Sequence, residues 1–332
     1  MNETNLLSAL GPLAPLYQDP TVLEIMVDAP DRVYVERRGA AGRGIEDTGL
    51  RFESPEALRA TIDAILALEG VRLGPDKTIG EARLPDARLL AVVPPTALGG
   101  PYLVIRKLVV TGLTWDQLVQ FGSVSREALD LLQGAVRAGL SLLIAGGTGS
   151  GKTTVANLLA GLVPPEQRIV IAESAHELDV QHPRVVHLEA GGAANVPFAD
   201  VLTTASHMRP DWLIVGELLG SEAMQVVQIM ARGHTGLTTI HANSVEDALT
   251  RLEAMCLMAN LGLGLGDIRL LIASAFRVVL HQEKLPDGKR RIVHIAELRG
   301  VEHDRFALQP LMRYNPSTDR LEPTGVKASW ES

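Results

Sequence analysis

The feature that most constrains this chain is a glycine-rich run at residues 146–153, which reads G-G-T-G-S-G-K-T. It fits the pattern G-x-x-x-x-G-K-[ST] at every position. The apolar run before it, residues 141–145, is typical of a buried strand, and residues 153–160 after it are typical of a helix. A strand, a glycine loop and a helix in this order form a cradle for phosphate, because backbone N–H groups and the helix N-terminus face the anion. The motif therefore predicts a nucleoside triphosphate site.

The motif also predicts what individual side chains do. Lys152 would reach the β- and γ-phosphates, and the Thr153 hydroxyl would ligate Mg²⁺. ATP and Mg²⁺ are therefore the expected cofactors. The residues predicted to bind the nucleotide are the loop and the start of the helix: Gly146, Gly147, Thr148, Gly149, Ser150, Gly151, Lys152, Thr153 and Thr154.

Composition limits the other classes of function. A length of 332 residues suggests two domains, and 46% hydrophobic residues suffice for a normal globular core. A net charge of −8 argues against nucleic acid as the main partner, since phosphate contacts need a basic surface. One cysteine, Cys256, excludes a disulfide framework and a four-cysteine zinc site within one chain.

Targeting signals are lacking in the sequence. No run of 18 apolar residues predicts a transmembrane helix, and the first residues lack the basic start of a signal peptide. We expect a cytoplasmic protein that can still dock on a membrane complex.

Secondary-structure signals divide the chain into an N-terminal α+β domain at 1–110, a linker at 111–124 and a second domain at 125–332. In the first domain, residues 56–68 place Leu58, Ile62, Ile65 and Leu66 on one helical face. Strands are predicted at 22–27, 32–36, 89–93 and 102–105.

The second domain alternates helices and strands, which predicts a mostly parallel sheet covered by helices. Ser244 opens one further helix, and residues 285–289 read as a turn between two strands. The other predicted helices are 127–140, 198–208 and 221–232, and the other strands are 169–172, 185–188, 212–216 and 237–240.

A nucleotide loop of this kind needs carboxylates at the ends of neighbouring strands, to help hold Mg²⁺ and to orient the attacking water. Glu217 ends the apolar strand 212–216 and is the first candidate for both roles. Glu173 ends the strand 169–172, where it would face the γ-phosphate. Glu177 follows four residues later and either lines the site or points elsewhere.

Two histidines flank the strand 237–240. His241 lies at its C-terminal end, where ligand-binding groups gather in parallel sheets, and would sense the γ-phosphate. His234 lies before the strand and is the second candidate. A zinc site built from these two is not expected, because neither has a nearby cysteine or histidine partner in sequence.

These elements in this order resemble the secretion ATPase superfamily of type II secretion, type IV secretion and type IV pili. The resemblance rests on the glycine loop, Glu173 and Glu177, the Gly216-Glu217 pair and the two histidine signals. It extends to 34–39, 83–86, 93–95, 105–107 and 285–291, which look most like the CpaF/TadA type of Flp (Tad) pilus ATPases. Type IV secretion traffic ATPases and the conjugation ATPase TrbB are similar but more distant.

The resemblance implies a hexameric ring in which each chain has an N-terminal domain and a RecA-like domain, with ATP bound between them. Arg88 and Arg106 fall at the positions of the arginines that reach the phosphates from the N-terminal domain. An arginine at such a site neutralises transition-state charge. The implied partners are further copies of the chain and a membrane platform protein, on the cytoplasmic face of the inner membrane.

The sequence departs from the family pattern at four positions. Ser174 and Leu219 stand where the family has Asp and Arg, and His207 and Trp212 stand where it is usually basic. These departures predict a working but slow ATPase.

Three functions stay open at this point. The first is a motor that couples ATP hydrolysis to assembly of a Tad-type pilus or to protein secretion, with type IV secretion or conjugation as the alternative apparatus. The second is a scaffold that binds ATP and barely hydrolyses it. The third is a nucleic-acid translocase, which the net charge disfavours.

Overall fold

The computed structural model of the chain describes residues 3–37, 44–107, 112–191 and 196–331. The chain divides into two compact units, Met1–Val110 and Thr111–Ser332. Each unit has its own sheet and its own hydrophobic core. The first residue of the predicted linker, residue 111, lies outside the described residues.

The first unit contains a six-stranded sheet in the order β3-β2-β1-β6-β5-β4, in which all neighbouring strands are antiparallel. The sequence predicts four of these strands and misses the short β3 and the edge strand β4. The strands are β1 (Val22–Ala29), β2 (Arg32–Arg37), β3 (Ile45–Asp47), β4 (Ile79–Leu84), β5 (Ala87–Val92) and β6 (Tyr102–Lys107).

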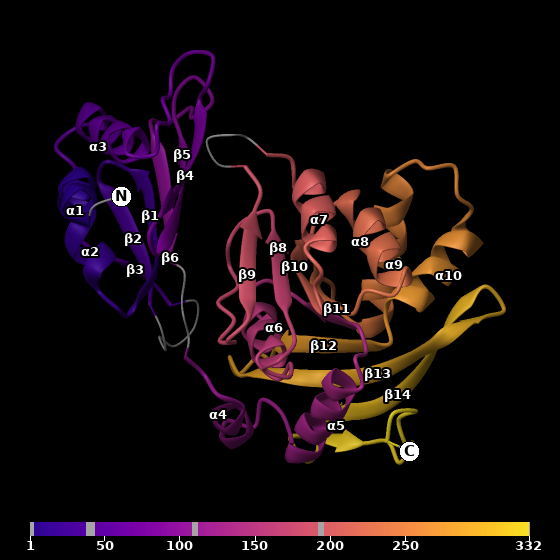
Figure 1. The fold of residues 1–332 in the computed structure, drawn as a ribbon. Coiled ribbons are helices and arrows are strands. Elements are labelled where there is room, and N and C mark those ends of the chain that lie inside the picture. Colours follow the sequence, from indigo (N-terminus) through magenta and orange to yellow (C-terminus); the bar gives the residue numbers. More distant parts are fainter. Residues whose placement is uncertain (1–2, 38–43, 108–111, 192–195, 332) are drawn as a thin grey trace. The chain divides into compact units, whose positions relative to one another are not determined.

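Three helices lie beside this sheet at the N-terminal end of the chain (Figure 1), and their apolar side chains share a core with one face of it. They are α1 (Glu3–Leu10), α2 (Ala14–Gln18) and α3 (Pro55–Ala67), with a 3-10 turn between the first two. Ser54 caps α3 by accepting the Ala57 N–H. The four apolar residues predicted on one face of α3 are the four that it buries. The unit is therefore an α+β domain.

The second unit is built on a nine-stranded sheet in the order β15-β14-β13-β12-β7-β11-β10-β8-β9. The six strands from β12 to β9 are parallel, and β13 to β15 extend the sheet antiparallel. The strands are β7 (Leu142–Gly146), β8 (Ile169–Glu173), β9 (Val185–Glu189), β10 (Trp212–Leu218), β11 (Gly236–His241), β12 (Val278–Lys284), β13 (Arg290–Glu302), β14 (Arg305–Asn315) and β15 (Arg320–Pro323).

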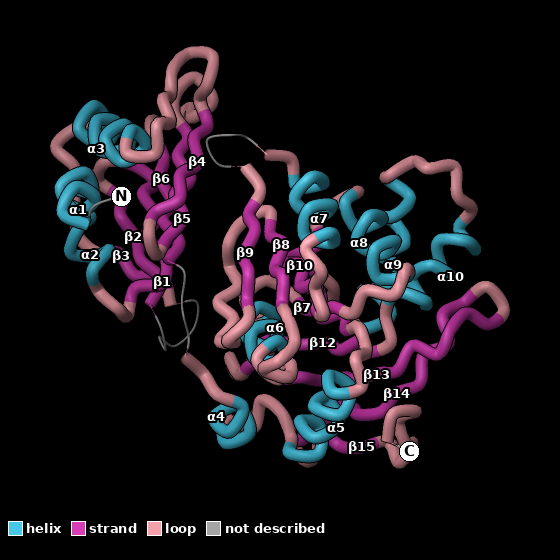
Figure 2. The backbone as a smooth tube through the Cα atoms, viewed as in Figure 1, coloured by secondary structure: helices cyan, strands magenta, loops and turns pink. Residues whose placement is uncertain are grey.

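Helices cover both faces of the large sheet and give it two cores (Figure 2). On one face lie α4 (Trp115–Gln120), α5 (Arg126–Arg137) and α6 (Lys152–Ala160). On the other lie α7 (Phe198–His207), α8 (Glu222–Ala231), α9 (Val245–Met258) and α10 (Leu265–Ala275). The alternation of helices and strands predicts a mostly parallel sheet covered by helices. The structure confirms this prediction, with one helical layer on each face of the sheet.

Much of the segment predicted as a linker is structured in the second unit. Thr114 opens α4 with a capping box that Gln117 completes. Leu118 and Val124 are buried in the core shared with α5, and the Trp115 indole N–H donates to the Leu158 carbonyl at 3.1 Å. Residues 112–124 therefore pack as part of the second unit, because their apolar side chains have a core to enter.

Candidate nucleotide site

The glycine loop lies between β7 and α6, as the sequence predicts. All five residues of β7 are buried, and α6 begins at Lys152. Gly149 and Gly151 have φ values of 69° and 99°, in the left-handed region that glycine enters without strain. These two positions turn the chain from the strand end into the helix.

The loop packs against the rest of the protein at Gly146 and has free space beside Gly147 and Gly149. A Cβ on Gly146 would lie 2.4 Å from the Gln282 carbonyl oxygen, and a Cβ on Gly147 or Gly149 would meet nothing within 4 Å. The open side exposes glycine backbone next to the N-terminus of α6. That arrangement fits a phosphate group.

Strands β12 and β13 hold the loop from its packed side. The Gln282 side-chain amide donates to the Ser150 carbonyl at 3.1 Å, and Arg290 Nε donates to the Gly149 carbonyl at 2.8 Å. Gln282 pairs with Gly146 across β12 and β7. Neither side chain can be predicted from the sequence, because the pairing of β7, β12 and β13 is what brings them to the loop.

Lys152 links the loop to the neighbouring strand ends. Its Nζ donates to the Gly147 carbonyl at 3.3 Å and lies 3.2 Å from Glu217 Oε1. The Lys152 side chain is 10% exposed and that of Glu217 is 34% exposed. The structure therefore brings the motif lysine and the first candidate carboxylate into contact.

Strand register explains this meeting of residues far apart in sequence. His241 at the end of β11 pairs with Gly146 at the end of β7, and Glu217 in β10 pairs with Thr239 in β11. The register shifts at Gly216, as in a β-bulge, which re-aims the residue that follows. The C-terminal ends of these parallel strands form one edge, where ligands bind in such sheets.

Glu173 ends β8 at the same edge and is only 2% exposed. Its Oε1 accepts the backbone N–H groups of Glu177 and Leu178, each at 2.9 Å, and its Oε2 lies 3.2 Å from His176 Nδ1. Burial raises the pKa of Glu173, against the opposing effect of these hydrogen bonds. A Cβ on Gly216 would lie 3.2 Å from Glu173 Cγ, so the bare glycine makes room for this side chain.

The other predicted residues differ in where they lie. The Glu177 side chain is exposed, and the contact described between Glu177 and Glu173 is made by the Glu177 backbone N–H. Thr153 and Thr154 lie half-buried in the first turn of α6.

The two predicted histidines lie at opposite ends of β11. His241 is half-buried at the end next to the loop, whereas His234 precedes the strand. The seven-residue separation is about 20 Å along a strand. His234 is therefore not brought to the nucleotide loop of its own chain.

The two predicted arginines lie in the first unit, side by side. Arg88 in β5 pairs with Arg106 in β6, and Arg83 in β4 pairs with Arg88. Paired residues of neighbouring strands point to one face, so the three guanidinium groups form a row. Arg106 also pairs with Glu24 of β1 and forms an ion pair with it at 3.2 Å.

The four departures from the family pattern have different surroundings. Ser174 and Leu219 are exposed just beyond the ends of β8 and β10, and His207 is exposed at the end of α7. Trp212 is buried at the start of β10, where its indole N–H donates to Gln167 Oε1 at 2.9 Å. Its side chain fills the core at the end of the strand away from the loop.

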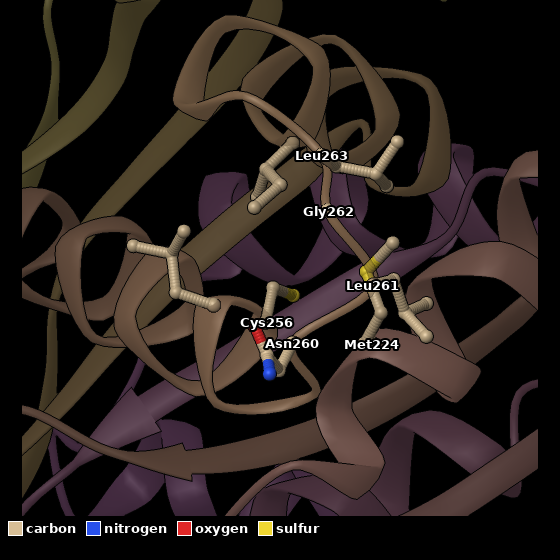
Figure 3. A pocket seen from close by; sticks show the side chains of 8 residues that line it. Met224, Cys256, Asn260, Leu261, Gly262 and Leu263 are labelled. Carbon is tan, nitrogen blue, oxygen red and sulfur yellow. The ribbon is translucent and has the colours of Figure 1, made fainter.

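A pocket between α8, α9 and α10 is separate from the glycine loop (Figure 3). It is lined by Met224, Cys256, Leu261 and Leu263 among others, and its volume is about 80 Å³. Ligand sites usually have 300–1,000 Å³. Burial raises the pKa of the Cys256 thiol to about 12, so the thiol is unreactive at neutral pH.

Within the described residues, each helix is too short or too polar to span a membrane.

Comparison with known proteins shows that the sequence of this chain fits a family model. Residues 7–303 fit the family model described as "Type II/IV secretion system protein". The chain is 32% identical over 309 residues to the putative conjugal transfer protein Rv3659c of Mycobacterium tuberculosis, covering 89% of this chain and 86% of that one. It is 33% identical over 320 residues to the type IV secretion system protein PtlH of Bordetella pertussis, covering 86% and 93%.

A solved structure shares the fold. The X-ray structure of the Legionella pneumophila ATPase DotB has a TM-score of 0.60 to this chain at 17% identity, covering 88% of this chain and 80% of that one. The predicted fold, a RecA-like domain preceded by a smaller α+β domain, is confirmed. Since the family model spans most of its length, the chain belongs to the type II/IV secretion system protein family.

Proposed function

We propose that the chain is an ATPase that binds MgATP at residues 146–154 and couples hydrolysis to transport by a type IV secretion or conjugation apparatus. The observation that carries the proposal is Lys152, which contacts both the glycine loop and Glu217. A lysine in this position can exchange those contacts for phosphate oxygens without moving its backbone.

Each side chain at the start of α6 and at the strand ends then has a chemical role. Lys152 would neutralise the β- and γ-phosphates, and Thr153 would ligate Mg²⁺ with its hydroxyl. Glu217 would hold the same ion directly or through water. Bound MgATP supplies the phosphoryl group and the cation that offsets its developing charge.

Glu173 and His241 are proposed to act on the γ-phosphate side. The raised pKa of Glu173 makes its carboxylate a better proton acceptor, which suits a residue that orients the attacking water. His241, at the edge next to Gly146, would donate a hydrogen bond to the γ-phosphate. Glu177 would serve through its backbone, since its N–H helps to fix Glu173.

Arg88 and Arg106 are proposed to supply positive charge to the phosphates from the first unit, which would act as the N-terminal domain of residues 1–110. Their row with Arg83 places three guanidinium groups on one face of a sheet, where Glu24 offsets part of the charge at Arg106. Such a row stabilises the charge that develops during phosphoryl transfer.

The apparatus is proposed from the relatives. The printed names of the two relatives described above are a conjugal transfer protein and a type IV secretion protein. These names favour type IV secretion over assembly of a Tad pilus, which stays the second candidate on the motifs quoted above. As in the family, we propose a homo-hexamer that docks on a membrane platform protein at the cytoplasmic face, without nucleic acid as a partner.

The test is steady-state phosphate release by the purified chain. We expect turnover that is abolished in Lys152→Ala, which loses the positive charge at the phosphates, and reduced about a hundredfold or more in Glu217→Gln, which weakens the hold on Mg²⁺. Lys327→Ala, an exposed lysine outside the site, is the matched control and should hydrolyse normally.

Other outcomes separate the alternatives. ATP binding with no release above the Lys152→Ala background would support a scaffold instead of an ATPase. Turnover stimulated by DNA, with a steep salt dependence, would support a translocase.

A further inference from the structure

Three side chains that can ligate a metal converge beside the nucleotide edge: Glu173 at the end of β8, His176 in the loop that follows, and His187 in β9. One ligand atom from each lies within 4.8 Å of those of the other two. Across β8 and β9, Ile171 pairs with His187 and Glu173 pairs with Glu189. Glu173 and His187 therefore point to the same face of the sheet.

The three side chains are held in place by their surroundings. Glu173 Oε1 accepts two backbone N–H groups, which leaves Oε2 directed at His176. The His176 backbone N–H donates to Glu189 Oε1 at 3.0 Å, which fixes the loop. The rings of His176 and His187 pack edge to face, with centroids 5.3 Å apart. Outer contacts of this kind orient metal ligands and raise affinity.

The donor set selects the class of metal. Two imidazoles and one carboxylate form a set that zinc takes in proteins, with the fourth position left to water, whereas Mg²⁺ prefers oxygen alone. Two ligand atoms of a tetrahedral zinc ion, each about 2.05 Å from it, lie about 3.3 Å apart. His176 Nδ1 and Glu173 Oε2 are 3.2 Å apart. His187 is exposed and gives the ion a path of entry from solvent.

We propose that Glu173, His176 and His187 form a binding site for a divalent transition metal of the zinc class. The site is distinct from the proposed magnesium position at Thr153 and Glu217. The competing reading is an ordinary hydrogen bond between His176 and Glu173, with His187 packed against it. That arrangement does not bind zinc tightly.

One consequence rests on the proposed function. If Glu173 orients the attacking water, zinc on its Oε2 would compete with that role and slow ATP hydrolysis. His187 has no part in the proposed ATPase, so His187→Gln should hydrolyse ATP normally and resist inhibition by zinc. The site itself is tested without nucleotide, so a failed ATPase leaves that test intact.

The test titrates the full, chelator-stripped chain with zinc chloride by calorimetry, and with Co²⁺ by visible absorption. We expect about one zinc ion per chain and the intense absorption of four-coordinate cobalt. His187→Gln should weaken zinc binding about tenfold or more and lose the cobalt band. His303→Asn is the matched control, because His303 is exposed in a turn at positive φ, which asparagine tolerates.

His187 is exposed, so its replacement should lower the thermal unfolding midpoint of the metal-free chain by no more than a few degrees, through the lost ring contact with His176. Equal zinc affinity in the native chain and in His187→Gln would overturn the site. So would weak, unsaturable binding by the native chain, or the same loss in His303→Asn.

Discussion

The glycines of the nucleotide loop differ in what a side chain would meet. Gly146→Ala would place a methyl group 2.4 Å from the Gln282 carbonyl oxygen and 2.5 Å from Ser150 Oγ. We expect it to lower the free energy of unfolding by about 1–3 kcal/mol, as overpacking does. Gly147→Ala meets nothing within 4 Å, so its effect should stay within about 0.5 kcal/mol.

Urea unfolding of the nucleotide-free chain checks this pair, since both glycines lie in the same loop. Equal stability of the two alanine variants would contradict the packing described for Gly146.

His294 in β13 makes stability depend on pH. Burial lowers its pKa to about 4, and Arg313 and His281 add to the effect against the opposing charge of Glu246. In the unfolded chain the pKa of histidine is about 6.5. As the pH falls from about 6.5 to 4, the unfolded state therefore binds a proton that the native state excludes. Stability should fall by up to about 1.4 kcal/mol for each pH unit from this residue.

His294→Phe removes the titrating group. The slope of unfolding free energy against pH, measured from pH 7 to 4.5, should be shallower in this variant than in the native chain. An unchanged slope would mean that other groups carry the acid sensitivity.

At the scale of elements, the sequence predicts best where a local pattern is strong. The helical face of α3 and the strand–loop–helix around residues 146–160 follow from spacing and composition alone. Strand β3 is three exposed residues, and edge strand β4 contains a glycine, so neither carries a strong pattern. The antiparallel extension by β14 and β15 depends on long-range pairing, which spacing does not encode.

The same division holds for the candidate site. Glu173 and Glu217 can be picked out as candidates because each follows an apolar strand pattern. Gln282, Arg290 and His176 cannot, because their contacts depend on which strands and loops become neighbours. The distance of His234 from the loop depends on strand direction, which a pattern of two histidines around a strand does not give.

Strand β12 gives a prediction of its own. Gln282→Ala removes the amide that donates to the Ser150 carbonyl inside a buried site. We expect a stability loss of about 1–3 kcal/mol and weaker ATP binding, because the loop loses a support on its packed side. Glu283→Gln, the exposed neighbour, is the control and should behave as the native chain.

Thermal unfolding with and without ATP measures both effects. If Gln282→Ala bound ATP with the affinity of the native chain, the loop would keep its shape without this hydrogen bond.

At the scale of the whole molecule, each unit has its own sheet and core. A fragment of residues 112–332 should therefore unfold cooperatively and still bind MgATP, more weakly than the full chain because the phosphates lose the two arginines of the first unit. Its hydrolysis should be strongly reduced, because Arg88 and Arg106 are absent. Full-rate hydrolysis by the fragment would remove the proposed role of the arginines.

The most direct test of the central claim is calorimetric titration of the full chain with ATP, in the presence and absence of Mg²⁺. We predict saturable, magnesium-dependent binding of about one nucleotide per chain, lost in Lys152→Ala. A native chain that takes up no nucleotide in the presence of magnesium would contradict the account.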